Sequence, residues 1–297
     1  AGIAAAVVLL SILLSRMLTR KISTLLTAIR KVRAGAYEHR TNISGRDEIA
    51  QIGEEFNSLT DRLQTTETVR RRFVSDASHE LKTPLAAIRL LTDSILQTDQ
   101  MDMETVRDFV TDIGSEAERL SRITEDLLRL TRLDSDLLDA PETVEVAPVL
   151  EQVMRMMSLL AQEKGTELTY RMEENCRVSA TKGEVHQVIY NLTDNAVKYS
   201  GKNGKVRVEL QHEDHDVVLT VTDNGPGIPE EDLPKVFERF YRVDKARSRA
   251  AGGTGLGLSI VQDTVKKRGG TVSVANRSNG GAVFTVRWPE AEGGDRS

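Results

Sequence analysis

The residue with the clearest potential for chemistry is His79, which lies in the segment Phe-Val-Ser-Asp-Ala-Ser-His-Glu-Leu-Lys-Thr-Pro-Leu, residues 73–85. It is two residues from both Ala77 and Leu81, so it stands about 200° around a helix from each of these apolar residues. Its imidazole is therefore expected to face water. A neutral imidazole in water is a competent nucleophile. Glu80, the next residue, could hold one ring nitrogen and leave the other free, whereas the alternative for a lone histidine is a structural role.

Two further residues of this segment bear on His79. Thr83 lies one turn beyond it, on the same face of the expected helix. Pro84 has no N–H to donate to the carbonyl of Glu80, and its ring crowds that carbonyl. We therefore expect the helix to bend or loosen beside His79.

A second group of polar side chains shares one face of a helix predicted over residues 183–199. Asn191, Asn195 and Lys198 are spaced four and three residues apart, so they form a polar stripe. Such a face suits a hydrated Mg²⁺ that is bound through an amide oxygen and phosphates, with Lys198 on a triphosphate. A solvated helix surface is the alternative.

Two glycine-containing segments could approach a ligand closely. The first, Asp-Asn-Gly-Pro-Gly-Ile at residues 223–228, follows a predicted strand, and Asp223 can accept a hydrogen bond from an exocyclic amine such as that of adenine. A simple turn is the alternative there. The second segment leads into a helix and offers backbone amides to phosphate oxygens. The residues concerned are Gly225 and Gly227 in the first segment and Gly253, Thr254, Gly255, Leu256, Gly257 and Leu258 in the second.

The second segment is not a Walker loop, because Leu258 stands where a lysine is required, and the Rossmann spacing fails as well. The sequence Phe-Glu-Arg-Phe-Tyr-Arg, ending at Arg242, lies between the two glycine segments. The polar stretch that follows it, rich in Lys, Arg, Ser and Ala, is predicted to be a mobile lid. A disordered surface loop is the alternative, and both can hold because a lid must move.

Composition limits the elements that can carry these groups. With 297 residues the chain should contain two or more folded units, at about 100 to 200 residues per domain. Contents of 39% apolar and 29% charged residues exclude a wholly membrane-embedded protein and a disordered one. The net charge of −5 argues against a nucleic-acid partner. The lone Cys176 excludes an internal disulfide and a multi-cysteine metal site, as suits a reducing cytoplasm.

The first residues are predicted to lie in a membrane. Residues 1–14 are apolar except for Ser11. Residues 1–18 would rise only about 27 Å as a helix, short of the roughly 30 Å hydrocarbon core, and the chain begins with Ala1, so we interpret the span as cut off. Basic residues follow the apolar run rather than precede it, which places residues after about 18 in the cytoplasm. A signal-peptide core and a buried soluble helix are the alternatives.

The middle of the chain reads as helices with aliphatic seams. Apolar stripes predict one helix over residues 18–33 and a second that begins near Asp47 and Glu48 and continues to residue 95. Residues 97–103 read as a polar turn. A further helix has a seam with coiled-coil spacing at Val106, Val110, Ile113, Ala117, Leu120, Thr124, Leu127 and Thr131.

One such hairpin leaves its apolar faces half open, so we expect two copies to pair into a four-helix bundle in a homodimer. Asp139-Ala140-Pro141 reads as a linker. Beyond it, alternating helices and strands predict an α/β domain. We expect helices over 147–163, 183–199 and 257–268 and strands over 167–172, 205–211, 217–223, 271–275 and 282–288.

Several of these segments resemble parts of one family, the sensor histidine kinases of two-component systems. Residues 19–70 resemble a HAMP linker, with landmarks at Gly35, Asp47-Glu48 and Phe56-Asn57, although Lys21 replaces the usual Pro and Ala50 the usual Gly. A solvated coiled coil is the alternative for this stretch. The segment around His79 resembles the phosphoacceptor box. The segments that contain Asn191, Asp223, Arg242 and Gly253 resemble the N, G1, F and G2 boxes of the ATP-binding domain.

The resemblance implies a multidomain protein: a truncated transmembrane helix (1–18), a HAMP parallel coiled coil (19–70), a dimeric helical hairpin that forms a four-helix bundle (71–138), a Bergerat-type α/β sandwich (141–290) and a tail (291–297). It implies that His79 accepts a phosphoryl group, that Glu80 is its acid/base partner and that Glu80 with Thr83 positions water for phosphatase action. It further implies Mg²⁺ on Asn195, adenine on Asp223, the γ-phosphate near Arg242 during transfer, and the other phosphates near Asn191, Lys198 and Tyr199.

The expected function is therefore that of a sensor histidine kinase in the bacterial plasma membrane. It would phosphorylate itself on His79 from Mg-ATP, pass the phosphoryl group to an aspartate of a response regulator, and also dephosphorylate that regulator. One alternative is a phosphatase-dominant signalling scaffold without autokinase activity. Another is a conformational ATPase of the gyrase and chaperone group, which shares the sandwich. Thr181 stands where relatives often carry Asp before the Asn-bearing helix, and no functional penalty is expected from it.

Overall fold

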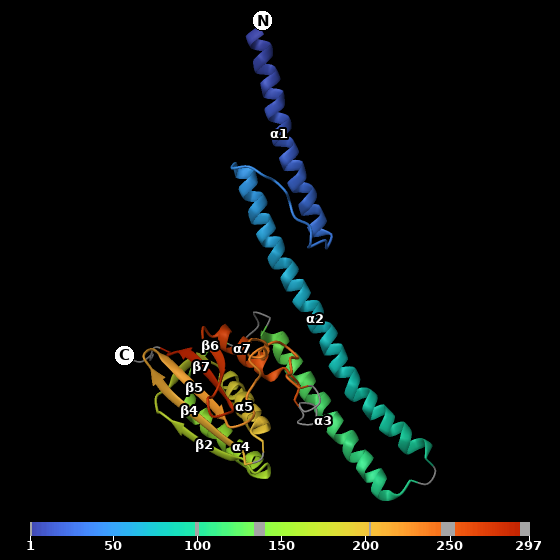
Figure 1. Cartoon of the computed structure of the whole chain (residues 1–297), viewed down its shortest axis with the longest axis vertical. Coiled ribbons are helices and arrows are strands. Elements are labelled where there is room, and N and C mark those ends of the chain that lie inside the picture. Colours follow the sequence, from blue (N-terminus) through green and yellow to red (C-terminus); the bar gives the residue numbers. More distant parts are fainter. Residues whose placement is uncertain (1, 99–100, 134–139, 202, 245–252, 292–297) are drawn as a thin grey trace. The chain divides into compact units, whose positions relative to one another are not determined.

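The computed structural model describes residues 2–98, 101–133, 140–201, 203–244 and 253–291 (Figure 1). They divide into two compact units, Ala1–Asp76 and Ala77–Ser297, with the boundary inside a long helix. Four expectations fall partly or wholly outside the described residues. These are most of the lid at 245–252, part of the turn at 99–100, Asp139 of the linker and residues 292–297 of the tail.

The first unit begins with helix α1 (Gly2–Arg33), which joins the predicted apolar span and the helix after it into one element. Among the described residues, α1 is the one helix that is long and apolar enough to cross a membrane. Its last turn is basic, with Arg30, Lys31 and Arg33. A turn with Gly35 at φ +95° then ends the helix as predicted.

Helix α2 (Glu48–Gln97) begins where the carboxylates of Asp47 and Glu48 predicted a helix start. The Asp47 carboxylate accepts the backbone amide of Ala50 at 3.0 Å, which caps the helix. It also accepts the Lys21 ammonium at 2.6 Å, and this hydrogen bond lowers the pKa of Asp47. Lys21, which replaces the proline usual at this point, therefore ties α1 to the start of α2.

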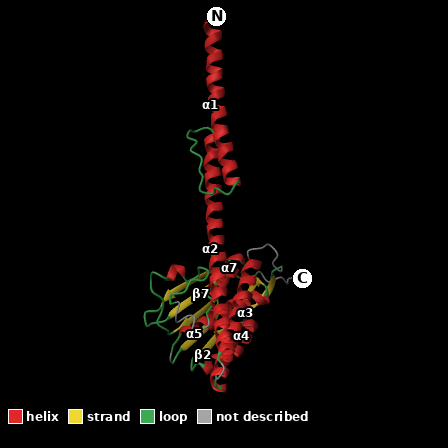
Figure 2. Ribbon diagram, turned by 90° about the vertical axis from the view of Figure 1, so that its right-hand side faces the viewer, coloured by secondary structure: helices red, strands yellow, loops and turns green. Residues whose placement is uncertain are grey.

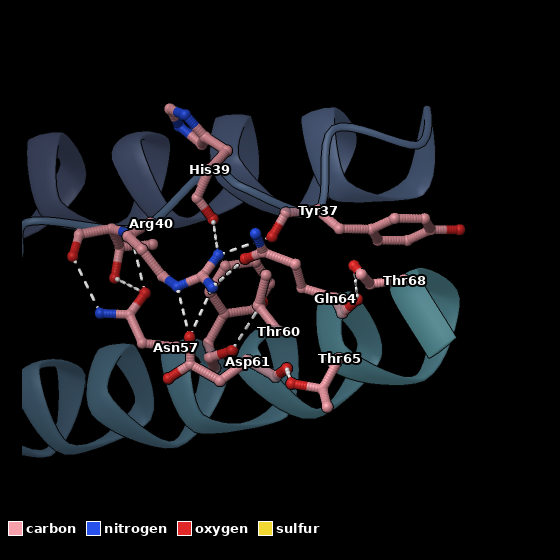
Figure 3. Close-up of polar contacts among 11 residues, drawn as sticks. Tyr37, His39, Arg40, Asn57, Thr60, Asp61, Gln64, Thr65 and Thr68 are labelled. Atoms are coloured by element: carbon pink, nitrogen blue, oxygen red, sulfur yellow. Dashed lines mark hydrogen bonds and ion pairs between the residues drawn. The ribbon is translucent and has the colours of Figure 1, made fainter. Parts of the chain in front are cut away.

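The connector between α1 and α2 is held against α2 by side chains (Figure 3). The guanidinium of Arg40 donates to the carboxylate of Asp61 at 2.9 Å and to the amide oxygen of Gln64 at 2.7 Å. The Asn57 amide accepts from the backbone N–H of Thr41 at 2.9 Å and donates to the carbonyl of the same residue at 3.0 Å. The two Asn57 bonds satisfy the backbone amide and carbonyl of Thr41, in a segment that has no strand ladder of its own.

The second unit opens with the rest of α2 and with α3 (Met103–Leu133), which form the predicted hairpin. Helix α2 stays helical through Pro84, so the expected loosening does not interrupt it. The hydroxyl of Thr83 donates to the carbonyl of His79 at 3.1 Å. The backbone is therefore helical on both sides of Pro84, although Pro84 has no N–H to donate to the carbonyl of Glu80.

Within one chain, helix α3 buries a stripe beside the seam that is predicted to pack in the dimer. Ile123 and Leu130, two helical turns apart, are fully buried. Arg119 and Leu133 are buried with them. Val110, on the predicted seam, is 56% exposed. Helix α3 contacts α7 (Gly257–Lys267) of the α/β domain, and Arg119 on the buried stripe contacts Glu80 of α2. The predicted seam was expected to pack against a second copy of the chain, so it stays partly exposed in one chain.

The α/β domain contains every strand and helix predicted for it, with small changes at the ends. In chain order its elements are β1 (Glu142–Glu145), α4 (Val146–Glu163), β2 (Glu167–Met172), β3 (Arg177–Ala180), α5 (Lys182–Tyr199), β4 (Lys205–Glu213), β5 (Asp216–Asp223), η1 (Leu233–Lys235), α7, β6 (Thr271–Asn276) and β7 (Ala282–Pro289). The short elements β1, β3 and η1 were not expected. They are four, four and three residues long, too short for a periodic pattern to emerge.

Five strands form one sheet in the order β2-β4-β5-β7-β6, and β1 pairs with β3 in a second sheet. The β2–β4 pair is parallel, and the other pairs are antiparallel. Alternate residues of β4 and β7 are buried, so one face of the sheet is covered. Helices α4, α5 and α7 pack on it, and the views show helices and strands in separate layers (Figure 1 and Figure 2). This is the predicted two-layer α/β sandwich.

Thr181 has a structural role that the sequence pattern did not reveal. Its hydroxyl accepts the amide of Glu184 at 3.2 Å, and the Glu184 carboxylate accepts the amide of Thr181 at 2.8 Å. The pair is a capping box at the start of α5. Arg268 donates to the same carboxylate at 2.8 Å and so ties α5 to the end of α7.

Replacing Thr181 by Ala should lower the free energy of unfolding of the α/β domain by about 1 kcal/mol, because one helix-end amide loses its acceptor. Trp288 is the only tryptophan of the chain and is buried in this domain, so its fluorescence during urea unfolding reports on the domain. Thr181→Asp is the matched control, since it keeps a capping oxygen. A Thr181→Ala variant with the parent's urea midpoint would contradict the capping role.

Candidate functional site

A cavity of about 660 Å³ opens at one end of the α/β domain. Its walls come from α5, the turn after β5, the segment before α7 and one face of α3. Twelve residues singled out from the sequence line it: Asn191, Asn195, Lys198, Tyr199, Asp223, Gly227, Arg242, Gly253, Thr254, Gly255, Gly257 and Leu258. The volume lies within the range typical of small-molecule sites.

The carboxylate of Asp223 is buried at the cavity wall. Its Oδ1 accepts the backbone amides of Gly225 at 2.8 Å and Ala282 at 3.3 Å. Burial raises the pKa of Asp223, and these two amides offset part of that effect. No hydrogen bond to Oδ2 occurs within the described chain. The second oxygen can therefore accept a donor from a ligand.

The turn after Asp223 depends on its glycines. A Cβ on Gly225 would collide with the carbonyl oxygen of Tyr199 at the end of α5, so only glycine allows this approach. Gly227 has φ +76°. Gly225 does not itself line the cavity. It brings the turn against α5, and Tyr199 and Gly227 then face the cavity.

The polar stripe of α5 is engaged differently at each position. Asn191 is buried, accepts from Gln187 at 2.8 Å and donates to the carbonyl of Gly257 at 3.0 Å, so it clamps the start of α7. Lys198 pairs with Asp194, one turn earlier, at 2.6 Å. This i,i+4 pair holds an ammonium at the cavity.

Asn195 is half-buried, lines the cavity and makes no side-chain hydrogen bond with other described residues. The described residues also hold no group of three or more His, Cys, Asp or Glu side chains that could bind a metal. A metal here would need most of its ligands from outside the protein. One amide oxygen beside a phosphate site fits Mg²⁺, which keeps water and phosphate ligands.

The glycine segment before α7 curves around the cavity. Gly255 has φ +73°, and a Cβ there would press on the backbone of Phe240. The backbone amide of Phe240 donates to the Gly255 carbonyl at 2.8 Å, which links this segment to the one that precedes the predicted lid. Helix α7 then begins at Gly257 and directs its N-terminus to the cavity. Leu256, expected at the site, is fully buried beneath the segment instead.

Helix α3 contributes to the same site. The hydroxyl of Thr254 donates to the carboxylate of Asp126 at 2.8 Å. Burial raises the pKa of Asp126, an effect that the Thr254 hydroxyl partly offsets. Arg122 and Arg129 also line the cavity from α3. Sequence analysis missed these residues and Glu125, which also lines the cavity from α3. All four share one helix face, but in the sequence they look like an ordinary solvated surface.

The environment of His79 differs in one respect from the expectation. The imidazole is exposed, as predicted, and does not line the cavity. No hydrogen bond joins Glu80 to it among the described residues. The Glu80 carboxylate instead accepts from Arg242 at 3.0 Å and from Arg119 at 3.2 Å. Arg242, a cavity residue, thus contacts the neighbour of His79.

Three stretches of the chain match known family models. Residues 13–65 match the HAMP domain, and residues 69–136 match the His Kinase A (phospho-acceptor) domain. Residues 180–292 match the histidine kinase-, DNA gyrase B- and HSP90-like ATPases, a match that implies ATP binding. The order of the three agrees with the resemblance noted in the sequence.

Curated relatives and solved structures agree with these matches. The chain is 34% identical to the signal transduction histidine-protein kinase AfsQ2 of Streptomyces coelicolor, over 97% of this chain and 57% of that protein. It is 30% identical to BaeS of Escherichia coli, over 95% of this chain and 60% of that protein. The chain thus spans less than two thirds of either relative. The structure of the histidine kinase ThkA in complex with response regulator protein TrrA has a similar fold, with TM-score 0.61 and 24% identity over 84% of this chain and 69% of that chain.

Proposed function

The chain belongs to the sensor histidine kinases of two-component systems, and on that premise we propose that it transfers the γ-phosphoryl group of Mg-ATP to His79 and then to an aspartate of a response regulator. One observation carries the proposal. Arg242, which lines the nucleotide cavity, contacts Glu80, the residue next to an exposed His79, at 3.0 Å. The cavity and the acceptor segment are therefore within reach of one another.

Each cavity residue has a part in this reaction. Asp223 accepts the exocyclic amine of adenine through its free oxygen. Asn195 would hold Mg²⁺, which would supply neutralisation of the phosphate charge. The backbone of residues 253–258 and the N-terminus of α7 face the phosphates, with Lys198 and Tyr199 beside them. Asn191 acts indirectly, by fixing the start of α7.

The transfer breaks the bond from the γ-phosphorus to the bridging oxygen of ATP, so that ADP leaves, and forms a bond from that phosphorus to the unprotonated imidazole nitrogen. The proton on the other ring nitrogen passes to Glu80. His79 must come within about 3 to 3.5 Å of the γ-phosphorus for this. Because His79 lies outside the cavity in this structure, the α/β domain must move along the hairpin between nucleotide loading and transfer.

Further parts of the proposal concern assembly and location. The predicted α3 seam is partly exposed in one chain, as at Val110, which supports a homodimeric four-helix bundle. Helix α1 supports anchoring in the bacterial plasma membrane. The boundaries proposed from the sequence, 1–18, 19–70, 71–138, 141–290 and 291–297, remain those of the proposed domains.

The proposal is tested by mapping the phosphate. The chain, in detergent, is incubated with Mg²⁺ and γ-labelled ATP, and the labelled peptide is identified. We expect phosphate that is stable in base and labile in acid, on the peptide that contains His79. Label on a serine or threonine would overturn the proposal. Nucleotide binding with no label, together with dephosphorylation of a regulator, would favour a phosphatase-dominant scaffold instead.

A further inference from the structure

A buried arginine of the hairpin contacts the proposed proton acceptor. Resting on the proposed function, we propose that Arg119 is a positioning residue for phosphoryl transfer. It holds the carboxylate of Glu80 beside His79 during the step in which Arg242 leaves Glu80 for the nucleotide. The proposal starts from the two hydrogen bonds that Glu80 accepts.

One oxygen of Glu80 is shared between two cations. Its Oε2 accepts from Nη2 of Arg119 at 3.2 Å and from Nη2 of Arg242 at 3.0 Å. The side chains of Arg119 and Arg242 are only 7% and 4% exposed, and that of Glu80 is 21% exposed. Charge-assisted hydrogen bonds in such sheltered positions fix a side chain more firmly than surface pairs do.

The two arginines reach Glu80 from different parts of the fold. Arg119 is on α3, which forms the hairpin together with α2, the helix that carries Glu80. Arg242 belongs to the α/β domain and also donates to the carbonyl of Thr254 at 2.8 Å. A movement of that domain breaks the contact of Arg242 with Glu80, whereas the contact of Arg119 lies within the hairpin and is kept.

Packing alone does not explain an arginine at position 119. It lies on the stripe of α3 that continues with Ile123 and Leu130, where an apolar side chain would avoid the cost of burying a charge. Its Nε has no hydrogen-bond partner among the described residues, and its second carboxylate, Glu116, is 3.6 Å away. The shorter contact is with Glu80, so orientation of that carboxylate is the gain that offsets the cost.

The consequence for the reaction is specific. Without Arg119, and with Arg242 on the nucleotide, no described cation would hold Glu80, and its side chain would sample other rotamers. A misplaced proton acceptor slows the chemical step but leaves nucleotide binding intact. Arg119 makes no contact with the cavity, since it is not among its lining residues.

The test compares three variants of the full chain in detergent: Arg119→Met, Arg119→Lys and, as a matched control, Arg107→Met at an exposed position of the same helix. The rate constant for labelling of His79 at saturating ATP and the KM for ATP are measured for each. We expect Arg119→Met to lower the rate constant about tenfold, with KM within about twofold of the parent. Arg119→Lys should recover most of the rate, because an ammonium can replace the single contact, and Arg107→Met should match the parent.

The outcomes separate this inference from the function on which it rests. If the parent is not labelled on His79, the proposed function fails. If the parent is labelled and Arg119→Met keeps its rate constant, only the positioning role is overturned. A loss that Lys does not rescue, or that raises KM in parallel, also overturns it, because a structural defect would act in that way. Should circular dichroism show that the Met variant is unfolded, Arg119→Gln takes its place with the same expected loss.

Discussion

The His79→Gln variant is expected to incorporate no acid-labile phosphate from ATP while it binds the nucleotide as the parent does. Glutamine keeps the length and polarity of the side chain but has no nucleophilic ring nitrogen. His79 is exposed and lies outside the nucleotide cavity, so its replacement should disturb neither the fold nor ATP affinity. Labelling with γ-labelled ATP and titration with a fluorescent ATP analogue measure the two properties separately.

The control for this variant is His215→Gln, a change at an exposed histidine of the α/β domain that does not line the cavity. It should be labelled like the parent. If His79→Gln were labelled as strongly as the control, the acceptor would be another residue. Unchanged steady ATP turnover in an unlabelled His79→Gln variant, equal to that of the parent, would favour a conformational ATPase.

The Asp223→Asn variant is expected to lose about 100-fold in affinity for ATP, and labelling of His79 should fall with it at ATP concentrations that saturate the parent. The oxygen of the asparagine can still accept the amides of Gly225 and Ala282, which fix the side chain. The side-chain NH₂ of the asparagine must then face the exocyclic amine of adenine. Both groups are hydrogen-bond donors, so no hydrogen bond can form between them. Isothermal titration with ATP measures the loss.

Asp216→Asn provides the matched control, because Asp216 begins the strand that Asp223 ends and does not line the cavity. Its ATP affinity should equal that of the parent. Trp288 fluorescence in urea shows whether either variant has lost stability. An Asp223→Asn variant that is folded and binds ATP like the parent would remove Asp223 from the adenine site.

Much of the fold was predictable because its signals are local. Residues close together in the chain determine the buried stripe of α5, the alternating burial of the strands and the start of α2. The exposure of His79 follows from its place on one helix in the same way. The pairing of Lys198 with Asp194 is equally local, because the two residues are four positions apart on one helix.

The contacts that complete the site are long-range, and no pattern in the sequence indicates them. Glu80 and Arg119 are 39 residues apart, and Glu80 and Arg242 are 162 apart. Glu80 was expected to hold the imidazole because His79 is its neighbour in the chain. In the folded unit, Arg119 and Arg242 both bind the Glu80 carboxylate, and the imidazole does not. The stripe that α3 buries within one chain is also set by residues distant in the sequence, which include those of α7 and, at Arg119, Glu80 of α2.

The hydrogen bond between Asp126 and Thr254 joins the helical hairpin to the glycine segment that curves around the nucleotide. A displacement of α3 therefore shifts one wall of the pocket, and a bound nucleotide resists that displacement. Thermodynamic linkage makes the two effects equal in free energy. A displacement of the helices can thus change the affinity of the pocket for ATP before any phosphoryl group is transferred.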